Sequence, residues 1–82
     1  MVYPNPVNDN TLNLKITSAS AQNITLIIND VFGRRMIQRS IHLVTGDNNY
    51  QLNIRSIAAG NYYAVIIPKD GSSDQVQKFI KK

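Results

Sequence analysis

The 82-residue sequence contains no cysteine, no tryptophan and no glutamate, and its only histidine is His42. Without cysteine the chain can form neither a disulfide nor a thiolate nucleophile. A single histidine falls short of the roughly three or four ligands that a zinc ion takes from a protein. No apolar run approaches the roughly 18 residues of a membrane-spanning helix, and no basic and apolar signal peptide stands at the start. We therefore expect a small domain that is held by its core and does not insert into a membrane.

Negative charge is also scarce. The chain has five acidic residues, all aspartate, against nine lysines and arginines, which gives a net charge of +4. A basic balance raises the prior for nucleic acid. The cations are scattered along the chain, however, and no stripe of basic residues alternates with aromatic ones, as single-stranded nucleic acid would require. The sequence predicts no nucleic-acid partner.

What the chain does contain is alternation of apolar and polar residues, and no segment keeps a helical period. Leu12, Leu14 and Ile16 alternate with polar neighbours, as in a strand with one wet face. Residues 61–67 are apolar on both faces, which predicts a central strand. Turn signals separate about seven short strands, counting the proline-rich start. Residues 1–82 are thus predicted to be one all-β domain, an immunoglobulin-like antiparallel β-sandwich.

Three turns carry most of this prediction. Asp30-Val31-Phe32-Gly33 suits a type I turn or a hairpin loop with a glycine bulge. Gly46-Asp47-Asn48 is predicted to be another turn. Ile57-x-x-Gly60-x-Tyr62 is typical of a tyrosine corner, in which the tyrosine hydroxyl bonds to upstream backbone. The alternative for Tyr62 is a plain core position.

The search for catalytic or metal-binding groups yields little. No serine or aspartate is placed near His42 by sequence, so a general base lacks its partner. Residues 8–10 and 47–49 are rich in Asp and Asn, whose oxygens suit calcium, but the same residues are ordinary turn formers. We expect no catalytic residue, no cofactor and no metal site, and leave bound calcium open.

Six landmarks follow one another along the chain. They are Tyr3-Pro4-Asn5-Pro6, Leu12-x-Leu14-x-Ile16, Asp30-x-x-Gly33, Gly46-x-Asn48, Ile57-x-x-Gly60-x-Tyr62 and Lys78-Phe79-Ile80-Lys81. In this order and at this length they resemble the type A C-terminal sorting domain of the type IX (Por) secretion system of Bacteroidetes. The chain departs from the commonest pattern at Arg34-Arg35-Met36 and at Ala64.

The resemblance implies a secretion signal at the end of a larger secreted protein. The cargo would pass through the periplasm, be recognised by an outer-membrane translocon, and end at the cell surface or in the medium. A sortase-like peptidase would usually remove the domain, upstream of Tyr3, and the cargo would be attached to the surface. The domain is a substrate in that process and not an enzyme.

The resemblance also implies roles for particular residues. The recognition signal would lie in the last strand, at Lys78, Phe79, Ile80, Lys81 and Lys82, with exposed cations and apolar anchors. The structural positions of the family would be Tyr3, Pro4, Asn5, Pro6, Asp30, Gly33, Gly46, Gly60 and Tyr62. Two physical alternatives remain for the chain ends. The terminal lysines can protect a sheet edge against aggregation, and the prolines of the stiff extended start can blunt one.

Other functions are compatible with the same fold. A fibronectin-like or carbohydrate-binding adhesion module would present exposed aromatic side chains, for which Tyr50 and Tyr63 are the candidates. A small enzyme would need a cleft and a base, and an oligomerising scaffold would join copies through strand edges. The oligomeric state is left open.

Overall fold

The structure, a computed structural model, describes residues 2–3, 10–69 and 73–82. Within these ranges the chain forms six strands of seven to nine residues and one two-residue strand at the start, and none of the residues is helical. The strands are β1 (Val2–Tyr3), β2 (Thr11–Ser18), β3 (Gln22–Asp30), β4 (Arg35–Leu43), β5 (Gly46–Asn53), β6 (Gly60–Pro68) and β7 (Gln75–Lys81).

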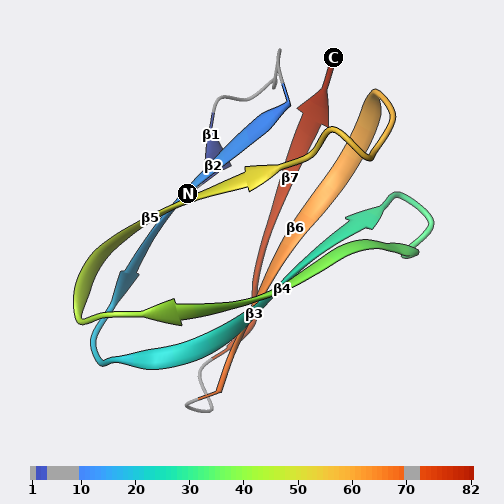
Figure 1. The fold of residues 1–82 in the computed structure, drawn as a ribbon. Coiled ribbons are helices and arrows are strands. Elements are labelled where there is room, and N and C mark those ends of the chain that lie inside the picture. The colour runs from blue at the N-terminus through green and yellow to red at the C-terminus, as the bar shows by residue number, and fades with distance from the viewer. Residues whose placement is uncertain (1, 4–9, 70–72) are drawn as a thin grey trace.

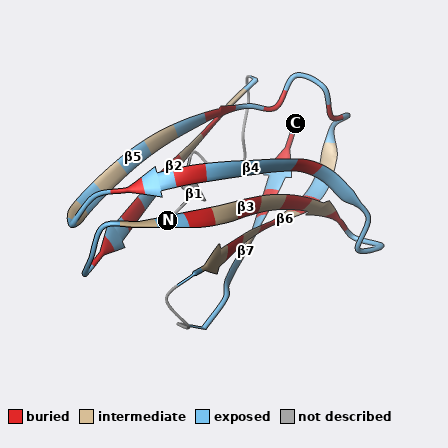
Figure 2. Ribbon diagram, turned by 60° about the horizontal axis from the view of Figure 1, so that its bottom comes forward, coloured by how far each residue is buried: buried red, intermediate tan, exposed pale blue. Residues whose placement is uncertain are grey.

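The strands form two antiparallel sheets, with orders β1-β2-β5 and β4-β3-β6-β7. The sheets lie over one another as two layers (Figures 1 and 2). The predicted all-β sandwich is therefore confirmed, with six full strands and the two-residue β1 at the start. Of the predicted proline-rich lead-in, Tyr3 belongs to β1, whereas Pro4, Asn5 and Pro6 lie outside the described residues. Nothing helical in the described part is long or apolar enough to cross a membrane.

The core forms because every second residue of each long strand turns toward the other sheet. Figure 2 shows this as an alternation of buried and exposed positions along the strands. In β6, Tyr62, Ala64 and Ile66 are buried, while Tyr63 and Val65 on the other face are half-buried. β6 lies between β3 and β7, which confirms the predicted central position. The buried apolar residues are Leu12, Leu14, Ile16, Ile24, Leu26, Ile28, Ile37, Ile41, Leu43, Leu52, Ile54, Ile57, Tyr62, Ala64, Ile66 and Phe79.

The predicted turn at Gly46-Asp47-Asn48 is wrong, because all three residues belong to β5 and the chain reverses just before them. Gly46 has φ = 101°, a left-handed conformation that suits the end of that reversal. The Asn48 side chain fixes the reversal from within the strand. Its Oδ1 accepts a hydrogen bond from the Val44 N–H (2.9 Å), and its Nδ2 lies within bonding distance of the carbonyls of Ile16 (3.2 Å) and Val44 (3.0 Å).

The strand registers bring distant segments together at one end of the sandwich. Asp30 at the end of β3 pairs with Tyr62, and Tyr62 pairs with Phe79 of β7. Gly60 pairs with Lys81. The turn after β3, the corner before β6 and the C-terminus therefore lie at the same end (Figure 1).

Candidate functional site

The described residues hold no cluster of three or more histidine, cysteine or acidic side chains that could bind a metal ion. His42 lies on an exposed face, and its Nδ1 is 2.8 Å from the Asn23 Oδ1. In the predicted oxygen-rich segment 47–49, Asp47 accepts a hydrogen bond from the Thr17 hydroxyl (2.8 Å). The Asn48 oxygen is engaged by the Val44 amide. Asn8 and Asp9 lie outside the described residues. The Asp47 side chain thus bonds to a neighbouring strand, and the Asn48 side chain bonds to the backbone.

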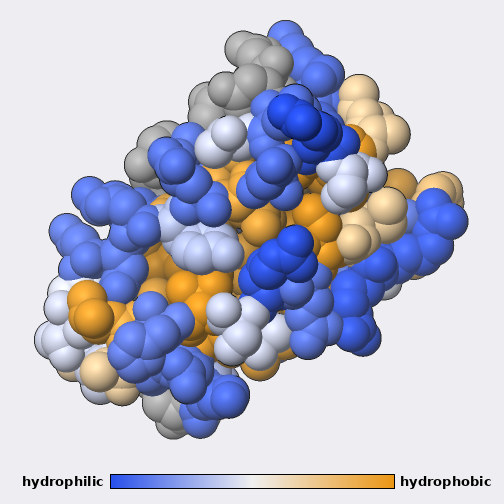
Figure 3. Space-filling model, in the orientation of Figure 1, coloured by the Kyte–Doolittle hydropathy of each residue, from blue (hydrophilic) through white to orange (hydrophobic). Residues whose placement is uncertain are grey.

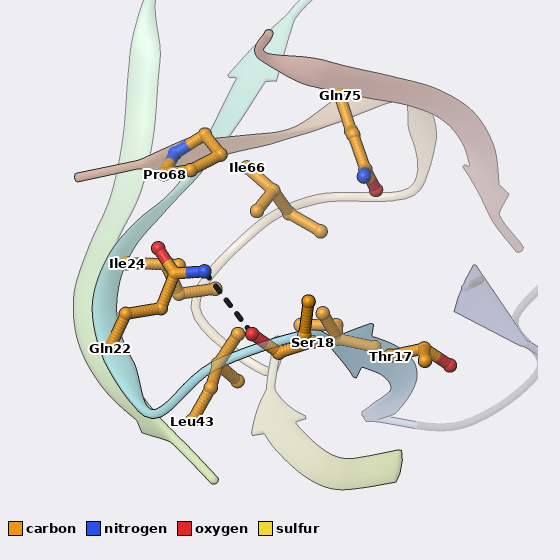
Figure 4. Close-up of a pocket in the computed structure, with 10 residues that line it drawn as sticks. Thr17, Ser18, Gln22, Ile24, Leu43, Ile66, Pro68 and Gln75 are labelled. Atoms are coloured by element: carbon orange, nitrogen blue, oxygen red, sulfur yellow. Dashed lines mark hydrogen bonds between the residues drawn. The ribbon is translucent and has the colours of Figure 1, made fainter. Parts of the chain in front are cut away.

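A hollow opens between the sheets at the end opposite the C-terminus (Figure 4). Its volume is about 140 Å³, below the roughly 300–1,000 Å³ typical of ligand pockets. Ser18 and Gln22 are bonded to each other in its wall (3.1 Å). Its lining is otherwise mostly aliphatic, and no ionisable side chain contributes to it. A second, shallower hollow is lined by Arg39, Asn53, Arg55 and Ser56. Neither hollow contains a nucleophilic side chain next to a general base.

The last strand, β7, has two chemically different faces. Phe79 is fully buried and stacks on Tyr62, with ring centroids 5.7 Å apart. Val76 and Ile80 on the other face are 62% and 41% exposed. Lys78 on that face is also exposed. Lys78 and Ile80 are the residues of the predicted signal on this face, and a partner can reach them because their side chains point away from the core.

Two residues of the predicted signal therefore do not match the expectation of exposed side chains. Phe79 is a core residue and is not available as an exposed apolar anchor. Lys81 is only 9% exposed, so it is not one of the exposed cations. Both point inward because they occupy alternate positions of one strand, and the face that buries Phe79 also buries Lys81. Lys82, the last residue, is exposed.

The Lys81 ammonium has a definite structural task. Its Nζ donates hydrogen bonds to the carbonyls of Ile54 (2.8 Å) and Ile57 (2.6 Å). These carbonyls belong to the segment that leaves the three-stranded sheet after β5 and leads to β6. Buried carbonyls need a donor, and a charged donor forms the stronger kind of hydrogen bond. Lys81 thus fastens the C-terminus to the corner between the two sheets.

The same corner is held a second time by Tyr62. Its hydroxyl donates a hydrogen bond to the carbonyl of Ala58 (2.6 Å), which confirms the predicted tyrosine corner. Tyr62 stacks on Phe79, and Gly60 pairs with Lys81 across β6 and β7. Phe79 and Lys81 therefore shape the end of the domain, while the outward residues of β7 form its surface.

The outward faces of the two sheets differ in chemistry. Asn13, Lys15 and Thr17 of β2 lie beside Gln51, Asn49 and Asp47 of β5 on the polar outer face of the three-stranded sheet. In the four-stranded sheet, Ile27, Val65 and Val76 form one row across β3, β6 and β7. The next row pairs Tyr63 with Lys78. The outer face of the four-stranded sheet therefore carries an apolar row beside a cation. In Figure 3, hydrophobic residues show between hydrophilic ones on the face in view.

The turn after β3 is built around the Asp30 carboxylate. Gly33 N–H donates to the Asp30 carbonyl (3.0 Å), and Gly33 has φ = 81°, which confirms the predicted turn with a glycine at the position that needs a positive φ. The carboxylate Oδ1 accepts hydrogen bonds from the N–H groups of Phe32 and Arg34 (2.9 Å each). The Arg34 guanidinium bonds to Oδ2 (2.6 Å).

Burial acts to raise the pKa of Asp30, but the hydrogen bonds from Arg34 and Phe32, together with the charge of Arg34, outweigh it and hold the pKa below its ordinary value. A carboxylate whose pKa is lower in the folded state contributes stability above its unfolded pKa of about 4, and that contribution is lost as the pH falls toward the folded value.

We expect the Asp30→Asn variant to be less stable than the wild type at neutral pH, and the difference to shrink as the pH falls below about 4. Urea unfolding at a series of pH values measures this. Asp74→Asn is the matched control, because Asp74 is exposed and lies outside the turn. A stability difference that stays constant from neutral to acidic pH would contradict the assigned role of the charge.

Comparison with known proteins gives one result. The family model of the secretion system C-terminal sorting domain matches residues 1–82. No curated protein and no solved structure matches the chain.

Proposed function

The chain belongs to the type IX secretion C-terminal sorting domain family, and from this premise we propose that residues 1–82 form a single domain that directs a larger cargo protein across the outer membrane. Membership in the family already implies an exported protein, secreted or at the cell surface, and an interaction with the secretion system. The family is not an enzyme family.

The route and the processing are part of the proposal. The cargo passes through the periplasm, and the folded domain is then recognised by the outer-membrane translocon. A sortase-like peptidase cuts upstream of Tyr3 and attaches the cargo to the cell surface. In this process the domain is the substrate. The resemblance of the ordered landmarks to the type A form supports these steps.

The observation that carries the recognition proposal is the division of β7 into two faces. The inward residues Phe79 and Lys81 hold the strand in place. The outward residues Lys78, Ile80 and Lys82 are exposed. An edge strand offers backbone groups for pairing with a partner strand, and exposed cations steer binding toward an acidic surface. We therefore assign the contacts with the translocon to the outward residues, and a supporting structural role to Phe79 and Lys81.

The alternative, a carbohydrate-binding or adhesion module, has no comparable support. Tyr63 lies on the outer face of the four-stranded sheet, whereas Tyr50 belongs to β5 of the other sheet and packs against the core. The two side chains cannot form one aromatic platform.

The proposal is tested by fusing residues 1–82, behind a flexible linker, to a reporter protein that is sent to the periplasm of a host with the type IX system. We expect the reporter outside the outer membrane when it carries the domain, and in the periplasm when it does not. The same fusion in a host that lacks the translocon should stay inside. Equal export with and without the domain would overturn the proposal.

A further inference from the structure

The tip of the turn after β3 exposes two apolar side chains that the fold does not need. Phe32 is 81% exposed and Val31 is 53% exposed. Phe32 is the most exposed large apolar residue of the described chain. An exposed phenylalanine costs solubility without adding to the core, and aromatic residues are enriched in protein interfaces. We call Val31 and Phe32 the turn tip.

The turn tip is held rigidly. The Asp30 carboxylate accepts hydrogen bonds from the backbone on both sides of Gly33, and the Asp30 N–H donates to the Arg34 carbonyl (3.0 Å). The Arg34 guanidinium is tied to Asp30 and lies 5.6 Å from the centre of the Phe32 ring, within the range of a cation–π contact. A side chain that is already positioned loses little conformational entropy on binding. The turn therefore presents Phe32 as a preformed anchor.

The turn that carries the tip lies at the same end of the four-stranded sheet as the C-terminal half of β7. Asp30, Tyr62 and Phe79 are register partners in one row across β3, β6 and β7. Neighbouring strands are about 4.8 Å apart, so the row places the base of the turn about 10 Å from β7. A standard interface covers about 800 Å² on each partner, enough to include both the turn tip and the outward residues Ile80 and Lys82. One partner can therefore contact both.

We propose that the turn tip is a second docking element, which inserts Phe32 into an apolar pocket of a protein of the secretion machinery while that protein contacts β7. This inference rests on the proposed export function and adds a surface to it. The pocket carries a carboxylate at its border, because Arg35, which follows the turn at the start of β4, is exposed.

The charges favour a protein over a lipid surface as the occupant. The Asp30 carboxylate neutralises Arg34, which leaves Arg35 as the uncompensated cation of the turn. A basic residue near an anionic membrane contributes only about 1 kcal/mol, so one cation and one aromatic ring hold a bilayer weakly. A preformed aromatic anchor instead suits a shaped pocket.

The test uses the reporter fusion with the variant Phe32→Ser. Loss of a buried aromatic anchor weakens binding by roughly tenfold or more, so we expect the exported fraction of the reporter to fall by about tenfold. Phe32→Tyr should restore export, because it keeps the ring. Val44→Ser is the matched control, since Val44 is 54% exposed and lies at the opposite end of the sandwich. All three variants should melt at the wild-type temperature.

The outcomes separate the two proposals. Export of Phe32→Ser at the wild-type level overturns the turn tip as a docking element and leaves the export function standing. Retention of the wild-type fusion itself overturns both. If the wild-type fusion binds vesicles of phosphatidylethanolamine and phosphatidylglycerol, and Phe32→Ser does not, the turn tip acts on lipid and a protein pocket is refuted.

Discussion

Replacing Phe79 by alanine is expected to lower the free energy of unfolding by about 3–5 kcal/mol, the usual cost of truncating a buried phenylalanine. Phe79 is fully buried and is the largest side chain among the least exposed core residues. Its removal leaves a cavity against Tyr62, the residue that holds the corner. Domains have total stabilities of about 0.05–0.15 kcal/mol per residue, so this loss is a large part of the whole for 82 residues.

Urea unfolding followed by circular dichroism measures this effect. Phe79→Leu is the control, because it keeps an apolar side chain of similar reach and should cost much less. We also expect the reporter fusion with Phe79→Ala to lose export, since its signal strand no longer has a fixed position. A Phe79→Ala variant that unfolds at the wild-type urea concentration would show that the aromatic ring lies outside the core.

Replacing Lys81 by methionine is expected to cost about 1–3 kcal/mol of stability, the penalty of leaving buried backbone acceptors without their donor. Methionine keeps an apolar stem that is only one atom shorter than lysine, but it cannot donate to the carbonyls of Ile54 and Ile57. The substitution also removes a buried charge, and the desolvation penalty that this charge pays is then no longer present. This gain opposes the loss of the hydrogen bonds, so the expected destabilisation is smaller than for Phe79→Ala.

Lys82→Met is the matched control, because Lys82 is exposed and its substitution removes the same charge one residue away. Thermal melting of both variants separates the two positions. Equal melting temperatures for Lys81→Met and Lys82→Met would contradict the structural assignment of Lys81 and return it to the list of residues that a receptor reads.

The alternation of apolar residues was enough to predict the strands and the faces of the sheets. Leu12, Leu14 and Ile16 are buried, and Tyr62 bonds to the upstream carbonyl of Ala58 as the corner pattern indicates. These features depend on local spacing, which a sequence displays directly. The error at Gly46 has the opposite origin. Its neighbour Asn48 is typical of turns, but its side chain bonds to the adjacent reversal from inside β5.

The role of Lys81 could not be predicted with the same ease. Lys81 stands two residues after Phe79 and so shares its inward face, but lysine is rarely buried, and residue type alone predicts an exposed cation. The carbonyls that compensate its burial lie at Ile54 and Ile57, 27 and 24 residues upstream. Only the packing of the two sheets brings them to the C-terminus. The exposure of Phe32 could not be predicted for a similar reason, because a turn pattern predicts the backbone conformation and not what surrounds each side chain.

The prediction for the start of the chain stays a prediction. Pro4, Asn5 and Pro6 lie outside the described residues, and β1 ends at Tyr3. A stiff, extended lead-in would suit the cleft of a peptidase that cuts upstream of Tyr3, and it would equally blunt a sheet edge.

The central claim is that the outward residues of β7 are read by the export machinery while the inward residues only hold the strand. Deleting residues 78–82 cannot test it, because the deletion also removes Phe79 and Lys81 from the core. The direct measurement is the exported fraction of the reporter fused to a domain with Lys78→Glu, Ile80→Ser and Lys82→Glu, with its melting temperature determined in parallel. The account predicts a domain that still folds, with the reporter retained in the periplasm. A folded variant that is exported as well as the wild type would contradict it.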